Sequence, residues 1–146
     1  MPAPDVIVHS SSSGGTQAGL VAGCRLLGLS TRVVGISADD SSTSLQSLVR
    51  AIVSGMADLL EMDPVTLSKG TAIEVDDHFV GEGYGIPTDE SREAMELAAR
   101  TEAIFLDPTY TAKAMAGLIA CVRQQKFKEN QTVLFWHTGG QVGLFA

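Results

Sequence analysis

Short apolar runs and helical patterns alternate along the whole chain, and this alternation restricts its fold more than any other feature. Five runs of apolar and β-branched residues predict buried strands, at 5–10, 31–37, 72–80, 103–108 and 132–140. Between them, apolar residues recur at helical spacing, at 16–27, 41–62, 89–100 and 110–125. This order predicts an α/β fold: an open, twisted, mainly parallel sheet between two helical layers, a three-layer αβα, Rossmann-like arrangement.

Particular residues are expected to limit these helices or to enter the core. The apolar stripe of the helix at 41–62 consists of Leu45, Leu48, Ile52, Met56 and Leu59. Pro64 should end that helix, Gly28 should cap the end of the helix before it, and Thr88 should cap the start of the next one. Trp136 is expected to lie in the core.

Length and charge limit the class of protein. The chain has 146 residues, which predicts a single domain with a core of its own. Its net charge of −7, without a basic block, argues against a surface for nucleic acid or an anionic membrane. No apolar stretch approaches the roughly 20 residues of a membrane span, and no signal peptide is evident. A cytoplasmic protein is expected, with Cys24 and Cys121 as buried free thiols.

The stretch HSSSSGGTQAGL, residues 9–20, joins a predicted strand to a predicted helix. The first N–H groups of a helix lack intrahelical partners and lie at the positive end of its dipole, so they favour an anion. The glycines allow close approach and the hydroxyls add donors, which predicts a phosphate site at Ser13, Gly14, Gly15 and Thr16. A turn capped by serine without any ligand is the simpler alternative.

The segments SSSGGT, LDPTYT and HTGG each follow a predicted strand, so they should converge at one edge of the sheet. A nucleotide is the weaker choice of ligand. Thr16 stands where a dinucleotide fingerprint needs its second glycine, and no lysine follows the glycines as in a P-loop. Asp39 and Asp40 have the position of a ribose-binding acid, but a solvated pair at a helix start is the simpler interpretation.

The segments SSSGGTQAGL, VGEGYGIP, ARTEAIFLDPTYTAKAMAGLI and FWHTGG occur in an order that resembles the family of D-cysteine desulfhydrase and aminocyclopropane-carboxylate deaminase. The resemblance implies pyridoxal phosphate as cofactor, held through its phosphate by residues 13–16, and a small amino acid as substrate. It also implies that Tyr84 and Tyr110 lie near the substrate and handle protons, and that Thr138 lies near the pyridine nitrogen. Thr111, at a cofactor-site position, fits the desulfhydrase-like branch better than the deaminase branch, which tends to have glutamate there.

The same resemblance implies that a residue is missing. The family's Schiff-base lysine belongs to an asparagine-lysine-x-arginine-lysine motif well before the serine-glycine loop, whereas only twelve residues, none of them lysine, precede Ser13. Lys113 is the nearest candidate substitute among the four lysines. We therefore expect residues 1–146 to form the large cofactor-binding part of a truncated or split enzyme, without the small domain and inactive alone.

Two alternatives for the partner and for the function remain open at this point. The expected partner is either a second copy, in a homo-oligomer, or a complementing N-terminal half, because a missing half would leave apolar surface uncovered. The competing function is a non-catalytic module that binds a phosphate ligand or a nucleotide.

Overall fold

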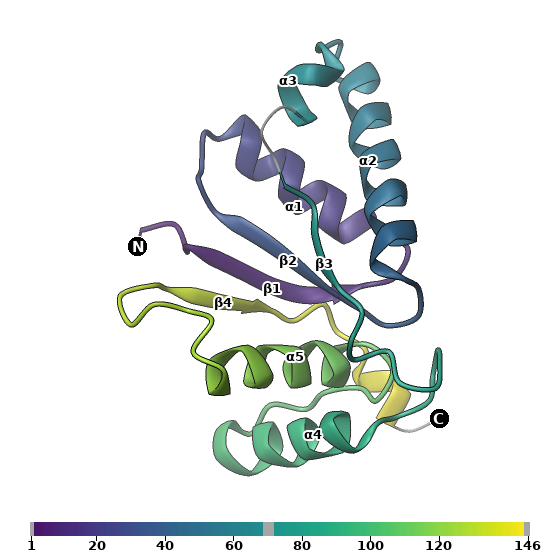
Figure 1. Ribbon diagram of the computed structural model, residues 1–146, viewed down its shortest axis with the longest axis vertical. Helices are drawn as coiled ribbons and strands as arrows, with labels where there is room; N and C mark the ends of the chain where they lie inside the picture. Colours follow the sequence, from purple (N-terminus) through teal and green to yellow (C-terminus); the bar gives the residue numbers. More distant parts are fainter. Residues whose placement is uncertain (1, 69–71, 145–146) are drawn as a thin grey trace.

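The computed structural model describes residues 2–68 and 72–144, and in this part of the chain a parallel sheet lies between two helical layers (Figure 1). Its strands are β1 (Val6–Ser11), β2 (Arg32–Ser37), β3 (Glu74–Asp76) and β4 (Val133–Trp136), in the order β3-β2-β1-β4. One face carries α1 (Gly15–Leu26), α2 (Ser42–Leu59) and α3 (Pro64–Ser68). The other carries α5 (Thr111–Arg123), with α4 (Asp89–Glu102) outside it and η1 (Gln141–Leu144) near the end of the chain. The predicted three-layer α/β fold is confirmed.

Burial of both faces explains why β1 and β2 are apolar almost throughout. On the α5 side, Val6, Val8 and Ile36 pack with Ala114 of the helix. On the opposite side, Val33 of β2 joins a cluster with residues of α1 and α2. A central parallel strand is covered twice, so its sequence is a continuous apolar run rather than an alternating one.

The prediction of a strand at 103–108 is wrong. This segment pairs with no strand in the described part of the chain and runs as a connection from α4 to α5. Only Leu106 of its apolar residues is buried, against Ala98 and Ala112, while Ile104 and Phe105 stay exposed. The apolar run therefore packs between helices instead of entering the sheet.

Two other predicted strands are shorter than expected because they form the edges of the described sheet. β3 has three residues instead of the nine predicted at 72–80, and all three are only half-buried. β4 has four residues instead of the nine predicted at 132–140. Trp136 is 44% exposed on this edge strand, so its assignment to the core is wrong.

The buried face of α2 also differs from the predicted stripe. Leu45, Val49, Val53 and Ala57 face the core, whereas Leu48 and Leu59 are exposed. Ile52 and Met56 lie at the border and pack against the cluster from the side.

Helix ends follow the predicted chemistry more closely. Thr88 and Ser91 form a reciprocal capping box at the start of α4. Gly28 has a φ of +66° directly after the last turn of α1, as a C-terminal glycine should. Pro64 begins α3, and α2 already ends at Leu59.

Two further expectations, on the cysteines and on membrane spans, can be compared with the structure. Cys24 and Cys121 are free thiols, but both are half-buried rather than fully buried. None of the helices in residues 2–68 and 72–144 combines the length and the apolar character needed to cross a bilayer.

Candidate functional site

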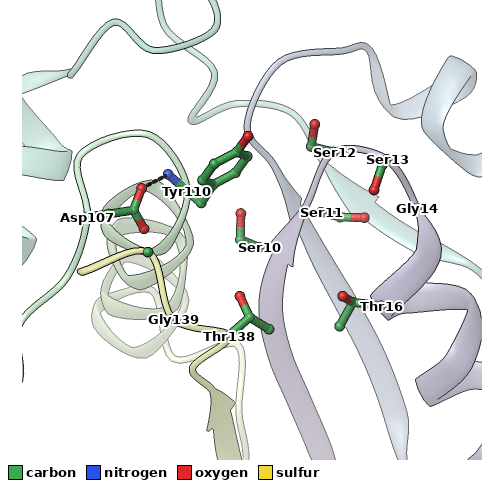
Figure 2. A pocket seen from close by; sticks show the side chains of 11 residues that line it. Ser10, Ser11, Ser12, Ser13, Gly14, Thr16, Asp107, Tyr110, Thr138 and Gly139 are labelled. Atoms are coloured by element: carbon green, nitrogen blue, oxygen red, sulfur yellow. Dashed lines mark hydrogen bonds between the residues drawn. The ribbon is translucent and has the colours of Figure 1, made fainter. Parts of the chain in front are cut away.

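A cleft of about 390 Å³ lies at the carboxyl ends of β1 and β4 (Figure 2). Segments far apart in the sequence form its walls: Ser10, Ser11, Ser12, Ser13, Gly14, Thr16, Asp107, Tyr110, Thr138, Gly139 and Gly140. The three loops expected at one edge of the sheet therefore do converge, which confirms that part of the prediction.

The loop from β1 to α1 presents an open helix N-terminus to the cleft. Gly14 has the N-cap position with a φ of +75°, and no side chain caps the helix. The first backbone bond of α1 runs from the Ala18 N–H to the Gly14 carbonyl, so the N–H groups before it have no intrahelical acceptor. Ser13 and Thr16 add exposed hydroxyls on the same side. Such a donor set suits an anion and needs no basic side chain.

Gln17, in the first turn of α1, fastens the base of this loop. Its Oε1 accepts a hydrogen bond of 2.8 Å from the Ser11 hydroxyl, and its Nε2 donates to the Glu74 carbonyl at 2.7 Å. The side chain crosses β2 directly over Gly35, where a Cβ would lie 2.3 Å from Oε1. Glycine at position 35 is thus required for the buried amide to reach across the sheet.

Two polar atoms beside the loop are buried without a hydrogen-bond partner in the described residues. One is the hydroxyl oxygen of Ser10, which points into the cleft in Figure 2. The other is Oδ1 of Asp39, whose Oδ2 accepts a 2.5 Å hydrogen bond from Ser12. Asp40 accepts from the Ser41 N–H and so lies at the helix start, as the simpler interpretation expected.

Asp107 organises the turn that carries Tyr110. Its carboxylate is 2% exposed, and its Oδ2 accepts the N–H groups of Thr109 and Tyr110 at 2.9 and 2.8 Å. Its Oδ1 accepts the N–H and the hydroxyl of Thr111 at 2.9 and 2.6 Å. Thr111 is therefore buried behind the turn and does not line the cleft. The sequence analysis missed Asp107, although an aspartate just before a helix is a common capping signal.

Tyr110 lines the cleft and contacts Tyr84, which comes from a different segment and is not itself among the lining residues. Their hydroxyls share a hydrogen bond, and the rings lie edge to face with centroids 5.7 Å apart. Tyr110 is half-buried at the start of α5, while Tyr84 is exposed on the loop between β3 and α4. The hydrogen bond to Tyr84, then burial and the charges of Tyr84, Asp39 and Asp107, raise the pKa of Tyr110 to about 12. Its hydroxyl thus holds its proton at neutral pH.

Thr138 closes the cleft from the end of β4, and His137 beside it fixes the turn that follows. The Nε2–H of His137 donates to the Phe105 carbonyl at 3.0 Å, and its Nδ1 accepts the Gly139 N–H at 3.1 Å. The turn then brings Gly140 so close to Asp107 that a Cβ there would lie 2.4 Å from Oδ1. The FWHTGG and DPTYT segments therefore form one continuous wall.

None of the described lysines lines the cleft. The ammonium of Lys113 is fully buried and donates to the carbonyls of Ala38, Val80 and Gly83. Burial lowers the pKa of Lys113. Lys126 and Lys128 are exposed beyond the last residue of α5, and Lys69 lies outside the described residues. The structure argues against Lys113 as a substitute nucleophile, because its amino group is enclosed and fully hydrogen-bonded.

Comparison with known proteins agrees with this geometry. Residues 1–139 match the family described as pyridoxal-phosphate dependent enzyme. The fold matches the crystal structure of a homologue of ACC deaminase with a TM-score of 0.84 and 32% sequence identity over 96% of this chain. The match covers 41% of that protein's chain. These matches confirm the resemblance found in the sequence, and the chain belongs to the family of pyridoxal-phosphate-dependent enzymes.

Proposed function

We propose that this chain is the cofactor-binding part of an enzyme that uses pyridoxal phosphate for β-elimination or deamination of small amino acids of the D-cysteine type. One observation carries the proposal: the open N-terminus of α1 and Tyr110, which is hydrogen-bonded to Tyr84, lie in the wall of a single cleft. A phosphate at one wall would place the rest of a small ligand within reach of the other. The relationship to an ACC deaminase homologue supports the same class of substrate.

The residues of the cleft suit the cofactor's phosphate. Ser13, Gly14, Gly15 and Thr16 would hold it with hydroxyl groups and with the N–H groups at the start of α1. The unpartnered hydroxyl of Ser10 supplies a further polar contact in the wall. When bound, pyridoxal phosphate supplies an electron sink for the α-carbon of an amino acid.

The opposite wall offers groups for proton handling. The pKa of Tyr110, raised to about 12, keeps its hydroxyl protonated in the free protein, so the hydroxyl does not act as a base there. Tyr84 can pass a proton to or from it through their shared hydrogen bond. Thr138 would lie near the pyridine nitrogen, where a neutral hydroxyl does not enforce ring protonation as a carboxylate would.

Turnover would require a lysine from outside the described residues. Lys113 is committed to three carbonyls, and Lys126 and Lys128 lie at the far end of α5. The partner we propose is a complementing lysine-bearing N-terminal half or a second copy, which would cover the exposed Leu134 and Trp136 at the β4 edge. Light scattering should then show association at high concentration, and a clean monomer would contradict this part of the proposal.

Cofactor binding can be tested with two glycines of the same segment. A Cβ at Gly14 would lie 3.1 Å from Val49 on a backbone with positive φ, whereas a Cβ at Gly19, one turn further along α1, would meet nothing within 4 Å. Gly14→Ala should therefore distort the loop and weaken binding of pyridoxal phosphate by about tenfold or more, which equals about 1.4 kcal/mol. Gly19→Ala is the control and should bind nearly as the wild type does.

Binding is measured by cofactor absorbance, with inorganic phosphate as competitor and circular dichroism as a check on folding. Equal binding by both variants would move the phosphate site elsewhere. Stabilisation by ADP but not by pyridoxal phosphate would favour the nucleotide-binding alternative.

Catalysis is tested by sulfide and ammonia release from D-cysteine. The chain alone, loaded with pyridoxal phosphate, should show no more than a slow background rate. Addition of a lysine-bearing N-terminal half from a related enzyme should raise the rate. Robust activity of the chain alone, with Lys113 labelled after borohydride reduction, would overturn the proposal.

A further inference from the structure

Lys113 is the largest fully buried side chain of the described residues. It neither lines the cleft nor belongs to an apolar core cluster, so its burial needs another explanation. An ammonium group removed from water costs several kcal/mol unless polar partners replace its hydration. Lys113 also lies in the first turn of α5, at the positive end of the helix dipole, where a cation is unfavourable. A lysine in such a position must gain from the contacts that it makes.

Those contacts use all three donors of the ammonium group. Nζ donates to the carbonyls of Val80 and Gly83 at 2.8 Å each, and to that of Ala38 at 3.2 Å. All three acceptors are backbone oxygens, so the lysine recognises the path of the main chain and not particular side chains. Charge-assisted bonds of this kind are roughly twice as strong as neutral ones.

The acceptors belong to two different connections of the chain. Ala38 directly follows β2, and Val80 and Gly83 lie in the glycine-rich loop after β3. The residue after Gly83 is Tyr84, and Tyr110 stands three positions before Lys113. One side chain thus ties the loop that carries the first tyrosine to the helix that carries the second.

We propose that Lys113 is a positioning residue, whose ammonium group clamps the loop at 80–84 onto α5 and so holds the Tyr84 hydroxyl against that of Tyr110. The importance of this clamp for the reaction rests on the proposed role of the two tyrosines. The clamp itself needs no cofactor, so it can be tested separately.

The test is Lys113→Met, which keeps an unbranched side chain, one atom shorter, and removes the charge and the three donors. The chain has two tyrosines, so nuclear magnetic resonance of protein with labelled tyrosine rings reports on this pair alone. At neutral pH the wild type should show nuclear Overhauser contacts between the two rings, whose centroids lie 5.7 Å apart. The variant should lose these contacts, because the loop that carries Tyr84 is no longer tied to α5.

Two controls define the signal. Lys128→Met makes the same substitution at an exposed lysine and should leave the ring contacts unchanged. Tyr84→Phe keeps both rings and removes the hydrogen bond between the two hydroxyls, so it separates loss of that bond from release of the loop.

Wild-type ring contacts between Tyr84 and Tyr110 in a folded Lys113→Met variant would overturn the proposal. In the unmodified protein, nuclear magnetic resonance of the Lys113 ammonium group should detect couplings across hydrogen bonds to the carbonyl carbons of Val80 and Gly83. An ammonium group that exchanges freely with water would also overturn the proposal. This measurement tests the clamp even if the variant does not fold. Pyridoxal phosphate binding should persist in the variant, because Lys113 contacts none of residues 13–16. If the wild type also fails to bind pyridoxal phosphate, that result counts against the proposed function and leaves the clamp untouched.

Discussion

Gly140→Ala offers the sharpest test of how the wall of the cleft is built. Gly140 has a φ of +93°, and an added Cβ would lie 2.4 Å from Oδ1 and 2.7 Å from Cγ of Asp107. Either the turn or the carboxylate must move. Since Asp107 accepts four hydrogen bonds at the start of α5, its displacement would loosen the turn that presents Tyr110.

The neighbouring glycine supplies the reference for the size of the effect. Gly139 has a φ of +102°, but a Cβ there would meet nothing within 4 Å. Gly139→Ala should therefore cost only backbone strain, about 1–2 kcal/mol. Gly140→Ala adds the loss of at least one bond to a buried carboxylate, about 1.5–3 kcal/mol, for a total of about 3–5 kcal/mol.

Urea denaturation of both variants and the wild type measures the two unfolding free energies. In thermal melts, a domain of this size should lose about 2–4 °C for each kcal/mol. Gly140→Ala should also weaken the tyrosine pair, which the nuclear Overhauser contacts between the two tyrosine rings report at neutral pH. Equal destabilisation by the two variants would refute the argument that Asp107 and Gly140 are in tight contact.

Two further predictions concern the sheet. Burial lowers the pKa of His9 to about 4, so the unfolded chain takes up this proton first, and the contribution to stability present above pH 6.5 is lost as the pH falls toward 4. The loss should be about 3 kcal/mol, and His9→Phe should remove that part of the pH dependence in urea titrations; an unchanged slope would contradict it. Gly117→Ala would bring a Cβ 2.8 Å from Ile36 and should cost about 1–3 kcal/mol, whereas Gly55→Ala, with nothing within 4 Å, should not destabilise; equal effects in thermal melts would contradict the packing of α5 on β2.

The central strands were predicted well because a continuous apolar run followed by a helix start is compatible with only one position, in the middle of the sheet. β1 and β2 are short, β-branched and followed by helix starts, and both lie in the middle of the sheet, as continuous apolar runs require. The run at 103–108 has the same composition, but a strand also needs a free edge to pair with, and no local pattern shows whether one exists. Its burial comes from Leu106 alone, through contacts with helices on either side of it in the chain.

The candidate site was predictable where a motif lies in one segment. Ser13, Gly14, Thr16, Tyr110 and Thr138 line the cleft as expected, although their roles stay predictions, whereas Gly15 and Tyr84 are not among its lining residues. Thr111 does not line it, because a threonine after the turn can bond back to Asp107. The parts that sequence analysis missed depend on contacts between distant segments: the carbonyls around Lys113 and the approach of Gly140 to Asp107.

These missed contacts share one physical feature. At the edge of the sheet where ordinary strand pairing stops, the loops still contain N–H and carbonyl groups that need partners. Buried polar side chains supply them: Asp107 at the turn before α5, and Lys113 at the loop after β3. These two bond to main-chain N–H and carbonyl groups, so they fix the course of a loop whatever side chains the loop carries. Gln17 instead joins the Ser11 hydroxyl at the end of β1 to the Glu74 carbonyl of β3. The walls of the cleft are therefore held by the protein itself, and a phosphate ligand would bind to a preformed site without first having to order it.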